Sequence, residues 1–371
     1  MRLGFYAYDV GPAHMLATIA VVAKSRGHDV IIAPQQKDDG WMAHKHELQG
    51  CDLVCGSFSA FKMRGGGERV PVLEEIHMVN ALRFDEKAER VPFVLIEDVP
   101  GTSLRPAAVQ GLRKRPLAAA VVSTHHQIET TQKNAKIRYQ DVVYVGPPAH
   151  WRTSYNDMIF NSPVVSFTKT KGEQWGFTDA RDVTVFCVGG KDPYRDLELV
   201  ELVVKIGKEK FGERFVFVFK THPGEAPIRN KSPDGFDRRD EFLRTCDTWR
   251  AVINPHWTVA RIIRSVSMTI FVGTHTDSII AAYARIPGIV YSDERTPLDL
   301  RLHGIEGRWF VSELGGMLEA NGEEELKTCM ELLATPLGIE YLKMNQKRHF
   351  IPPEDWNTAP KIVEYLESLV R

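Results

Sequence analysis

Cysteine is scarce in this sequence and is not arranged for disulfides or for a metal. Its five cysteines are odd in number, and only Cys51 and Cys55 lie close together, with no second Cys or His pair at a zinc-like spacing. This pattern fits free thiols in a reducing compartment better than a disulfide framework. We interpret Cys51 and Cys55 as small buried residues beside a strand, and we predict no metal site.

Long apolar runs and an excess of charge are also missing. No apolar run approaches the roughly 20 residues that a membrane-spanning helix needs. The 47 Lys and Arg residues balance 48 Asp and Glu residues, so the net charge of −1 gives no general attraction to nucleic acid or anionic lipid. The chain starts directly with a predicted strand rather than with a charged and apolar leader. We therefore expect a cytoplasmic protein and leave open a membrane-peripheral position and a homodimer.

Strand and helix patterns alternate along most of the chain. The opening predicts a strand at 1–8, a turn at 9–14 and a helix at 15–26. The G-x-G-x-x-G spacing of dinucleotide-binding folds is absent from this turn, so we do not predict NAD. A second series follows, and its best-marked strand is the apolar and aromatic run at 215–219. Alternation of this kind predicts parallel sheets that helices cover on both faces.

The length of 371 residues favours two domains over one core. The stretch at 151–182 is irregular, polar and rich in Thr, Ser and Lys, which is typical of a connection between domains. We predict an α/β protein with Rossmann-like domains at 1–150 and 183–350. A C-terminal helix within 351–371 is expected to cross back to the first domain.

Polar and small residues follow several predicted strands of the second domain. Open α/β sheets bind ligands at such strand ends, where small residues let a phosphate approach the backbone. A helix that starts beside hydroxyl groups also offers free N–H groups to a phosphate, although the same hydroxyls serve ordinary helix capping. The residues that we predict to bind a nucleotide phosphate are Gly189, Gly190, Lys191, His222, Pro223, Thr276 and Ser278.

Three of these segments resemble motifs of a known family. Glu97-Asp98-Val-Pro-Gly101, Lys220-Thr-His-Pro-Gly-Glu225 and Thr274-His-Thr-Asp-Ser278 occur in the order of the acidic, His-Pro and Ser/Thr motifs of bacterial sialyltransferases. In that family Gly follows the acids directly, whereas Val99 and Pro100 intervene here. The resemblance implies the GT-B fold, in which two Rossmann-like domains face each other across a cleft.

A related set of segments resembles the non-hydrolysing UDP-N-acetylglucosamine 2-epimerases, which also have the GT-B fold. The stretch from Val94 to Arg105 is similar to their acid-bearing strand end followed by Leu-Arg. Thr276-Asp-Ser278 and Asp293-Glu-Arg-Thr-Pro297 are similar to their phosphate-binding turn and to the segment after the next strand. At the position of their second acidic motif, Glu-Glu-x-Asn-Arg, this chain has only Gln110-Gly-Leu-Arg-Lys-Arg115.

The resemblances imply roles for individual residues. Asp98 matches the catalytic acid of the sialyltransferases and is our first choice of base, with Glu97 as the alternative. His14, in the loop after the first strand, is a candidate for base, acceptor ligand or phosphate donor. Where many GT-B enzymes carry an acid for the ribose this chain has Ala281-Ala282-Tyr283, so Asp293 or Glu294 is expected to take over.

The predicted activity is an inverting glycosyl transfer from a nucleotide-sugar, with a pyrimidine base, to a hydroxyl acceptor that is a glycan, a lipid or a small molecule. No Asp-x-Asp motif occurs, so the transfer is expected to need no metal and no cofactor besides the nucleotide-sugar substrate. The alternatives are a nucleotide-sugar 2-epimerase or hydrolase on the same fold, and a non-catalytic nucleotide-sugar-binding module.

Overall fold

The chain divides into two units, which are described one at a time. A computed structural model describes residues 1–7, 10–34, 48, 50–57, 61–63, 69–71, 91–97, 119–122, 142–149, 151–152, 183–190, 192–222, 225, 229, 233–246, 250–252, 258–302, 307–351 and 356–370. The first unit consists of 1–152 together with 352–371, and the second of 153–351. Within the described residues, no helix is long and apolar enough to cross a membrane.

The first unit is built on a six-stranded sheet with the order β2-β1-β3-β6-β7-β8, in which all neighbouring strands are parallel. A short antiparallel pair, β4 with β5, lies apart from this sheet. The elements of this unit are β1 (Arg2–Ala7), α1 (Val10–Ser25), β2 (Asp29–Pro34), β3 (Leu53–Ser57), β4 (Phe61–Met63), β5 (Arg69–Pro71), β6 (Phe93–Ile96), β7 (Ala119–Val122), β8 (Val142–Tyr144) and α16 (Ala359–Val370).

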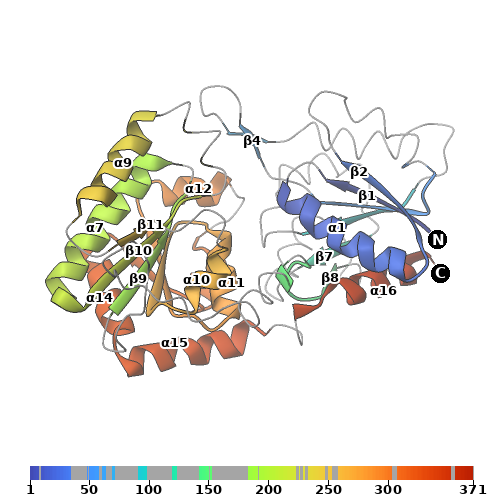
Figure 1. Ribbon diagram of the computed structural model, residues 1–371. Coiled ribbons are helices and arrows are strands. Elements are labelled where there is room, and N and C mark those ends of the chain that lie inside the picture. Colours follow the sequence, from blue (N-terminus) through green and yellow to red (C-terminus); the bar gives the residue numbers. More distant parts are fainter. Residues whose placement is uncertain are drawn as a thin grey trace, which may run out of the picture. The chain divides into compact units, whose positions relative to one another are not determined.

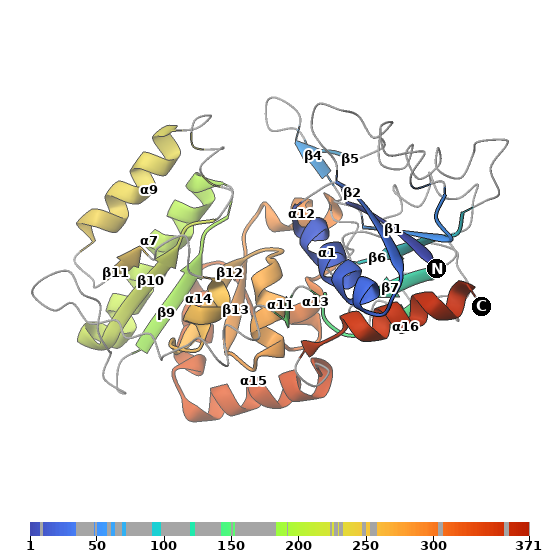
Figure 2. The same ribbon diagram turned by 45° about the vertical axis from the view of Figure 1, so that its right-hand side comes forward.

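The C-terminal helix α16 belongs to the first unit and lies beside α1 in both Figure 1 and Figure 2. Its residues Ile362, Val363 and Leu366 are buried in the same core as residues of α1, β1, β3 and β6. Glu367 adds polar contacts, because its carboxylate accepts hydrogen bonds from Arg26 at 2.9 Å and from His28 at 2.8 Å. A segment more than 300 positions away in sequence thus completes the core around β1.

The start of α1 differs from the sequence prediction. We expected a turn at 9–14, whereas the helix already begins at Val10. Pro12 fits the first turn of a helix, where the missing N–H has no intrahelical partner in any case. His14 therefore lies inside the helix and not in a loop, and its carbonyl accepts a hydrogen bond from the Thr18 hydroxyl at 2.8 Å.

The second unit contains a parallel six-stranded sheet with the order β11-β10-β9-β12-β13-β14. Its elements are β9 (Val183–Val188), α7 (Pro193–Phe211), the 3-10 turn η2 (Gly212–Arg214), β10 (Phe215–Lys220), α9 (Pro233–Thr245), β11 (Arg250–Val252), α10 (Val259–Ile263), β12 (Met268–Val272), α11 (Thr276–Tyr283), β13 (Gly288–Ser292), α12 (Thr296–Leu302), α13 (Phe310–Glu313), β14 (Leu318–Asn321), α14 (Glu323–Leu333) and α15 (Pro336–His349).

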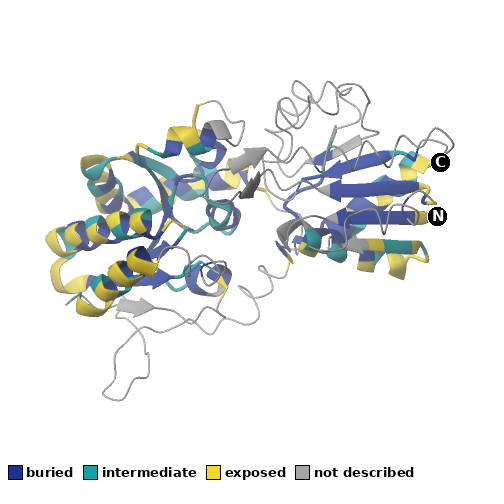
Figure 3. Cartoon of the chain, turned by 90° about the horizontal axis from the view of Figure 1, so that it is seen from above, coloured by how far each residue is buried: buried dark blue, intermediate teal, exposed yellow. Residues whose placement is uncertain are grey.

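Helices cover both faces of this sheet, as the unbroken apolar runs of β9 and β10 predict. Every residue of these two strands is buried. Helices α7, α9 and α14 pack on the face that carries Phe215, Phe217 and Phe219, and α10 and α11 lie on the other face (Figure 1). Figure 3 shows the same layering, since the helices are exposed only on their outer sides. Because helices cover both faces of such a sheet, a ligand can approach it at the ends of its strands.

Candidate functional site

The strand order of the second unit places a topological switch point between β9 and β12. From β9 the chain moves outward through β10 to β11, and it then returns to the other side of β9 to form β12, β13 and β14. Ligands of open α/β sheets bind outside the carboxyl ends of the strands at such a point, because the connecting loops diverge there. The residues after β9 and β12 are therefore the centre of the candidate site.

Gly189 and Gly190, which follow β9, form a tightly packed turn. The N–H of Gly189 donates to the carbonyl of Lys220 at 2.9 Å, which continues the pairing with β10. A Cβ atom on Gly189 would lie only 2.7 Å from Cζ of Phe219 and 3.0 Å from Oδ2 of Asp196. Glycine is thus required at position 189 for close packing, since this residue is buried, whereas Gly190 is partly exposed at the strand end.

A buried carboxylate fixes this turn from below. Asp196, in the first turn of α7, accepts a hydrogen bond from the N–H of Gly190 at 2.8 Å. Nη1 of Arg239 lies 3.4 Å from the same carboxylate, and its Nη2 donates to Glu225 at 2.8 Å. Burial raises the pKa of Asp196 to about 6, although the Gly190 N–H and the Arg239 guanidinium act in the opposite direction. The result is an ionic network inside the domain that positions the glycine turn.

His275 occupies the switch point from the side of β12. It is the N-cap of α11, and its Nδ1 accepts a hydrogen bond from the N–H of Asp277 at 3.3 Å. A neutral ring that accepts at Nδ1 carries its proton on Nε2. Burial lowers the pKa of His275, while the Asp277 carboxylate and a hydrogen bond with the backbone of Gly189 act to raise it. A neutral imidazole thus links the glycine turn to the start of α11.

The two predicted hydroxyl ligands of α11 have different surroundings. Ser278 is fully buried, and its hydroxyl donates to the carbonyl of His275 at 2.6 Å and accepts from Nε1 of Trp309 at 3.0 Å. Both hydrogen bonds stay within the protein, so we assign this hydroxyl to the turn and not to direct phosphate contact. Thr276 is the first residue of the helix and is only partly buried. Its hydroxyl and its own N–H remain candidates, whereas the N–H groups of Asp277 and Ser278 already bond His275.

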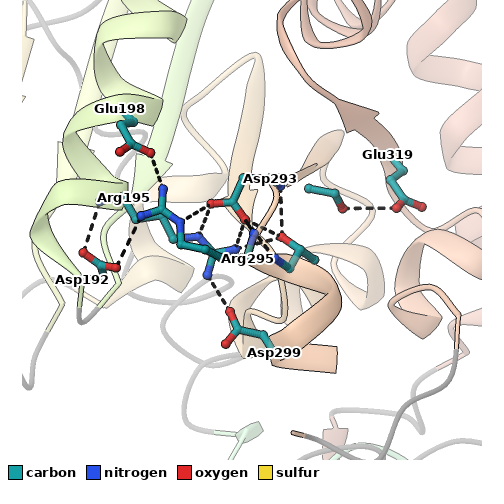
Figure 4. A network of polar contacts seen from close by, with 9 residues as sticks. Asp192, Arg195, Glu198, Asp293, Arg295, Asp299 and Glu319 are labelled. Carbon is teal, nitrogen blue, oxygen red and sulfur yellow. Dashed lines mark hydrogen bonds and ion pairs between the residues drawn. The ribbon is translucent and has the colours of Figure 1, made fainter. Parts of the chain in front are cut away.

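Both predicted ribose ligands, Asp293 and Glu294, lie after β13, and Asp293 belongs to a network of ion pairs (Figure 4). Asp293 accepts hydrogen bonds from Nε and Nη2 of Arg195 at 2.7 and 2.6 Å and from Nε of Arg295 at 3.0 Å. Nη1 of Arg195 also donates to Asp299 at 2.6 Å. These contacts lower the pKa of Asp293 despite its partial burial. Asp293 therefore organises the turn, and the neighbouring Glu294 is exposed.

The remaining predicted residues divide between the two units. Glu97 directly follows β6 in the first unit and is buried, and its N–H donates to the carbonyl of Val121 at 3.0 Å. His14 is an exposed residue of α1. In the second unit, His222 is half-buried after β10, and its carbonyl accepts from the N–H of Glu225 at 3.0 Å. Asp98, Lys191 and Pro223 lie outside the described residues. Their proposed roles, like that of His14, stay predictions.

The sequence analysis did not identify three residues of the site, namely Asp196, Arg239 and Arg195. Asp196 and Arg239 lie on amphipathic helices, where charged residues normally face solvent, and only their burial marks them. Arg195 is one of many arginines, and its carboxylate partners are about 100 positions away in sequence. No spacing rule connects these residues, because the sheet topology brings them together. Among the described residues, no group of three or more His, Cys, Asp or Glu side chains could hold a metal ion.

Comparisons with known proteins identify the fold. No protein-family model matches the sequence, and no curated protein matches it. Solved structures match over almost the whole chain. The glycotransferase of kitacinnamycin has a TM-score of 0.54 at 11% identity, covering 100% of this chain and 99% of that chain. MurG from Acinetobacter baumannii has a TM-score of 0.56 at 10% identity, covering 99% of both chains.

A third similar structure is the UDP-GlcNAc 2-epimerase from Methanocaldococcus jannaschii, solved in complex with UDP-GlcNAc and UDP. Its TM-score is 0.60 at 12% identity, and the match covers 99% of this chain and 100% of that chain. Two parallel sheets with helices on their faces and full-length matches of this kind show an α/β fold of the GT-B type. The GT-B prediction from the sequence is confirmed. The narrower resemblance to sialyltransferases stays a prediction.

Proposed function

We propose that the protein is a glycosyltransferase that transfers a sugar from a nucleotide-sugar to a hydroxyl group. The observation that carries this proposal is the junction of the glycine turn and the capped helix α11 at the switch point between β9 and β12. There His275 bonds the backbone of Gly189 and caps α11. The N–H groups of Asp277 and Ser278 bond His275, so the N–H and hydroxyl of Thr276 are proposed to bind the diphosphate. The partly exposed Gly190 lets the nucleotide approach the backbone.

The roles of the other residues follow from the chemistry of an inverting transfer. A carboxylate removes the proton of the acceptor hydroxyl while the nucleotide diphosphate leaves, and Asp98 is proposed for this step with Glu97 as the alternative. His222 donates to a phosphate oxygen of the leaving group, so that charge is stabilised without a metal. Glu294, exposed after β13, is proposed to accept hydrogen bonds from the ribose. The base is proposed to be uracil, because the similar epimerase binds UDP-GlcNAc and UDP.

The second candidate is a nucleotide-sugar 2-epimerase. Its support is the TM-score of 0.60 with the Methanocaldococcus jannaschii epimerase, which is higher than the 0.54 and 0.56 of the two other structures. The segment Asp293-Glu-Arg-Thr-Pro297, which resembles a segment of the epimerases in sequence, lies directly after β13, and its Asp293 and Arg295 belong to the network of Figure 4. An epimerase would use the same nucleotide site but would release an altered sugar without any acceptor.

Ligand-dependent stabilisation against heat tests the shared part of the proposal. UDP at 100 times its dissociation constant is expected to add roughly 2.7 kcal/mol to the free energy of unfolding. NAD serves as the negative control. If UDP, UDP-sugars and other pyrimidine nucleotides all leave the melting temperature unchanged, the proposed function is wrong.

Product analysis then separates the two activities. The protein is incubated with each stabilising UDP-sugar, first alone and then with a panel of sugar and lipid alcohols. A transferase releases UDP in step with a new glycoside, and only when an acceptor is present. Release of a 2-epimeric sugar or of its UDP-derivative without an acceptor would support the epimerase and exclude the transferase.

A further inference from the structure

Helix α15 carries an exposed apolar stripe on the outside of the second unit. The residues of the stripe, Leu337, Tyr341 and Met344, are 80%, 54% and 62% exposed. Spacings of four and three positions put these side chains on one face of the helix. Within the described part of the chain, half of the exposed large hydrophobic side chains lie between Leu332 and Ile351. Apolar side chains gathered in this way, in contrast to single ones, mark a surface that binds another molecule.

The opposite face of α15 fixes the stripe in this orientation. Leu342 and Gln346 are fully buried, and Leu342 belongs to the core of the second unit. The side-chain amide of Gln346 donates to the carbonyls of Ile286 and Gly316, both at 2.9 Å. Helix α15 packs against α14 and α11, and Figure 2 shows it along the outside of the unit. The stripe thus belongs to a firmly held helix and points away from the core.

Two charged residues flank the stripe along the same edge. Glu340 and Lys347 are separated by two helical turns, so both lie on one side of the apolar residues. The side chain of Glu340 is 67% exposed, and its carboxylate lies 3.9 Å from Nζ of Lys343, which leaves it accessible to another cation. Lys347 is exposed and forms no ion pair with a carboxylate of the described residues. The edge therefore presents an acid near the start of the helix and a base near its end.

An antiparallel pair of α15 helices would cover the whole stripe. A two-fold axis that passes midway between Tyr341 and Met344 also passes through the middle of α15 (Pro336–His349), so the two helices overlap along their full length. Tyr341 of each copy then packs against Met344 of the other. Leu337 packs against the apolar stem of Arg348 at both ends. Each copy uses the same surface, as a two-fold interface requires.

The charged edge favours this pairing over other uses of the stripe. The two-fold axis places Glu340 of each copy beside Lys347 of the other, so that opposite charges meet twice beside the apolar centre. In a parallel pair, each of these residues would face its own counterpart, and like charges would repel. An anionic lipid surface would attract Lys347 but repel Glu340. A second copy of the chain thus matches both the apolar residues and the charges.

We propose that the protein forms a symmetric dimer through α15, with Tyr341 and Met344 at the centre of the interface and Glu340 paired with Lys347 along its edge. The proposal is independent of the proposed function. Two paired helices of this length extend over about 21 Å. This contact is smaller than a standard protein–protein interface, so the expected dissociation constant is on the order of 10 μM.

Sedimentation velocity at about 1 to about 200 μM protein tests the proposal, because this range spans the expected dissociation constant. Wild type should shift from the 42.0 kDa monomer to twice this mass as its concentration rises. Glu340→Lys and Lys347→Glu each bring like charges together twice, and each should weaken the dimer about tenfold or more. The double variant Glu340→Lys/Lys347→Glu restores opposite charges and should dimerise within about threefold of wild type.

Two further variants complete the experiment. Glu213→Lys, in the exposed turn η2, makes the same change in net charge as Glu340→Lys and should leave the dimer unchanged. Met344→Glu places a charge in the apolar centre, so it should stay a monomer over the whole range of concentrations. Because Met344 is 62% exposed, this variant should keep a melting temperature close to that of wild type.

Three results would overturn the proposal. The first is wild type that stays a monomer over this range of concentrations. The second is a dimer that both single charge variants leave unchanged, because the two copies would then pair elsewhere. The third is monomeric wild type that binds vesicles of phosphatidylglycerol and phosphatidylcholine while Met344→Glu does not, which would assign the stripe to a membrane.

Discussion

The carboxylate of Asp196 accepts a hydrogen bond from the N–H of Gly190 at 2.8 Å, and through this bond an ionic network inside the second unit reaches the edge of the sheet. Asp196 stands between that turn and Arg239, whose guanidinium is fully buried and also contacts Phe219 and Phe236, 5.2 Å from each ring centroid. The geometry of the glycine turn is therefore coupled to the protonation state of a buried acid.

Replacing Asp196 by Asn is expected to change how stability depends on pH. Burial raises the pKa of Asp196 to about 6 in the folded protein, above the ordinary value of about 3.9 in the unfolded chain. Between these two values the folded protein keeps a proton that the unfolded chain has released, so the free energy of unfolding falls as pH rises. This contribution is complete below pH ~4 and is lost by pH ~6.

Urea unfolding of wild type and Asp196→Asn from pH 4 to pH 7 measures the effect. The stability of wild type relative to the variant should fall over this range by an amount on the order of 3 kcal/mol. Asp237→Asn, which removes an exposed carboxylate from α9, controls for the change in net charge. A constant difference between wild type and Asp196→Asn would contradict the elevated pKa.

Gly189 and Gly190 should respond differently to alanine. A Cβ on Gly189 would meet Phe219 at 2.7 Å, whereas the nearest atom to a Cβ on Gly190 is Oδ1 of Asp196 at 3.5 Å. We expect Gly189→Ala to lower the free energy of unfolding by about 1–3 kcal/mol because the core beneath it is overpacked. Gly190→Ala, as the matched control, should change it by less than about 1 kcal/mol. Equal losses in denaturant unfolding would show that the close packing at Gly189 does not matter.

The fold was predictable from the sequence because a buried parallel strand leaves a clear apolar run. The run at 215–219 gives β10, and the alternating pattern gives the two Rossmann-like units. Helix starts were predicted less well. The apolar residues at helical spacing predict a helix from 197, whereas α7 begins at Pro193, capped by Asp192. Asp192-Pro193 is a standard start signal, but the preceding glycines made the whole stretch resemble a loop.

The candidate site was predictable in its place but not in its contacts. The strand ends at Gly189 and His275 follow from the apolar runs that precede them. The sequence around Ser278 does not distinguish a hydroxyl that binds a phosphate from one that stabilises a turn. Only the position of Trp309, which is 31 residues away, decides between these uses. Contacts of this kind depend on how α13 packs against α11, and no local pattern encodes that packing.

The Ser278–Trp309 hydrogen bond is expected to be worth more to stability than to ligand binding. Ser278→Ala leaves Nε1 of the buried Trp309 without an acceptor, which should cost about 1–3 kcal/mol in the free energy of unfolding. In the double variant with Trp309→Phe no donor remains, so the combined loss should be smaller than the sum of the single losses. A strictly additive result in denaturant unfolding would contradict this coupling.

Affinity for UDP distinguishes the two hydroxyls at the start of α11. Ser278→Ala should bind UDP within about threefold of wild type, because its hydroxyl already bonds His275 and Trp309. Thr276→Val removes a partly buried hydroxyl from the first helical position while keeping its shape. We expect this variant to bind UDP about tenfold more weakly, the effect of one lost hydrogen bond to a charged group. The reverse order of affinities, measured by calorimetry, would assign the phosphate contact to Ser278.

Arg195 and Arg295 can be compared directly, since both bind the carboxylate of Asp293 but differ in how far their side chains are buried. The side chain of Arg195 is 14% exposed and also holds Asp299, whereas that of Arg295 is 34% exposed. Arg195→Met leaves two largely buried carboxylates short of a partner and should cost about 3 kcal/mol in the free energy of unfolding. Arg295→Met should cost less than about 1 kcal/mol, because a more exposed pair is screened by water.

Urea unfolding at low and high salt measures both, and the loss in Arg195→Met should hardly change with salt. Equal losses in the two variants, or a loss in Arg195→Met that disappears at high salt, would mean that the network in Figure 4 is a surface feature and does not fix the turn that carries Glu294.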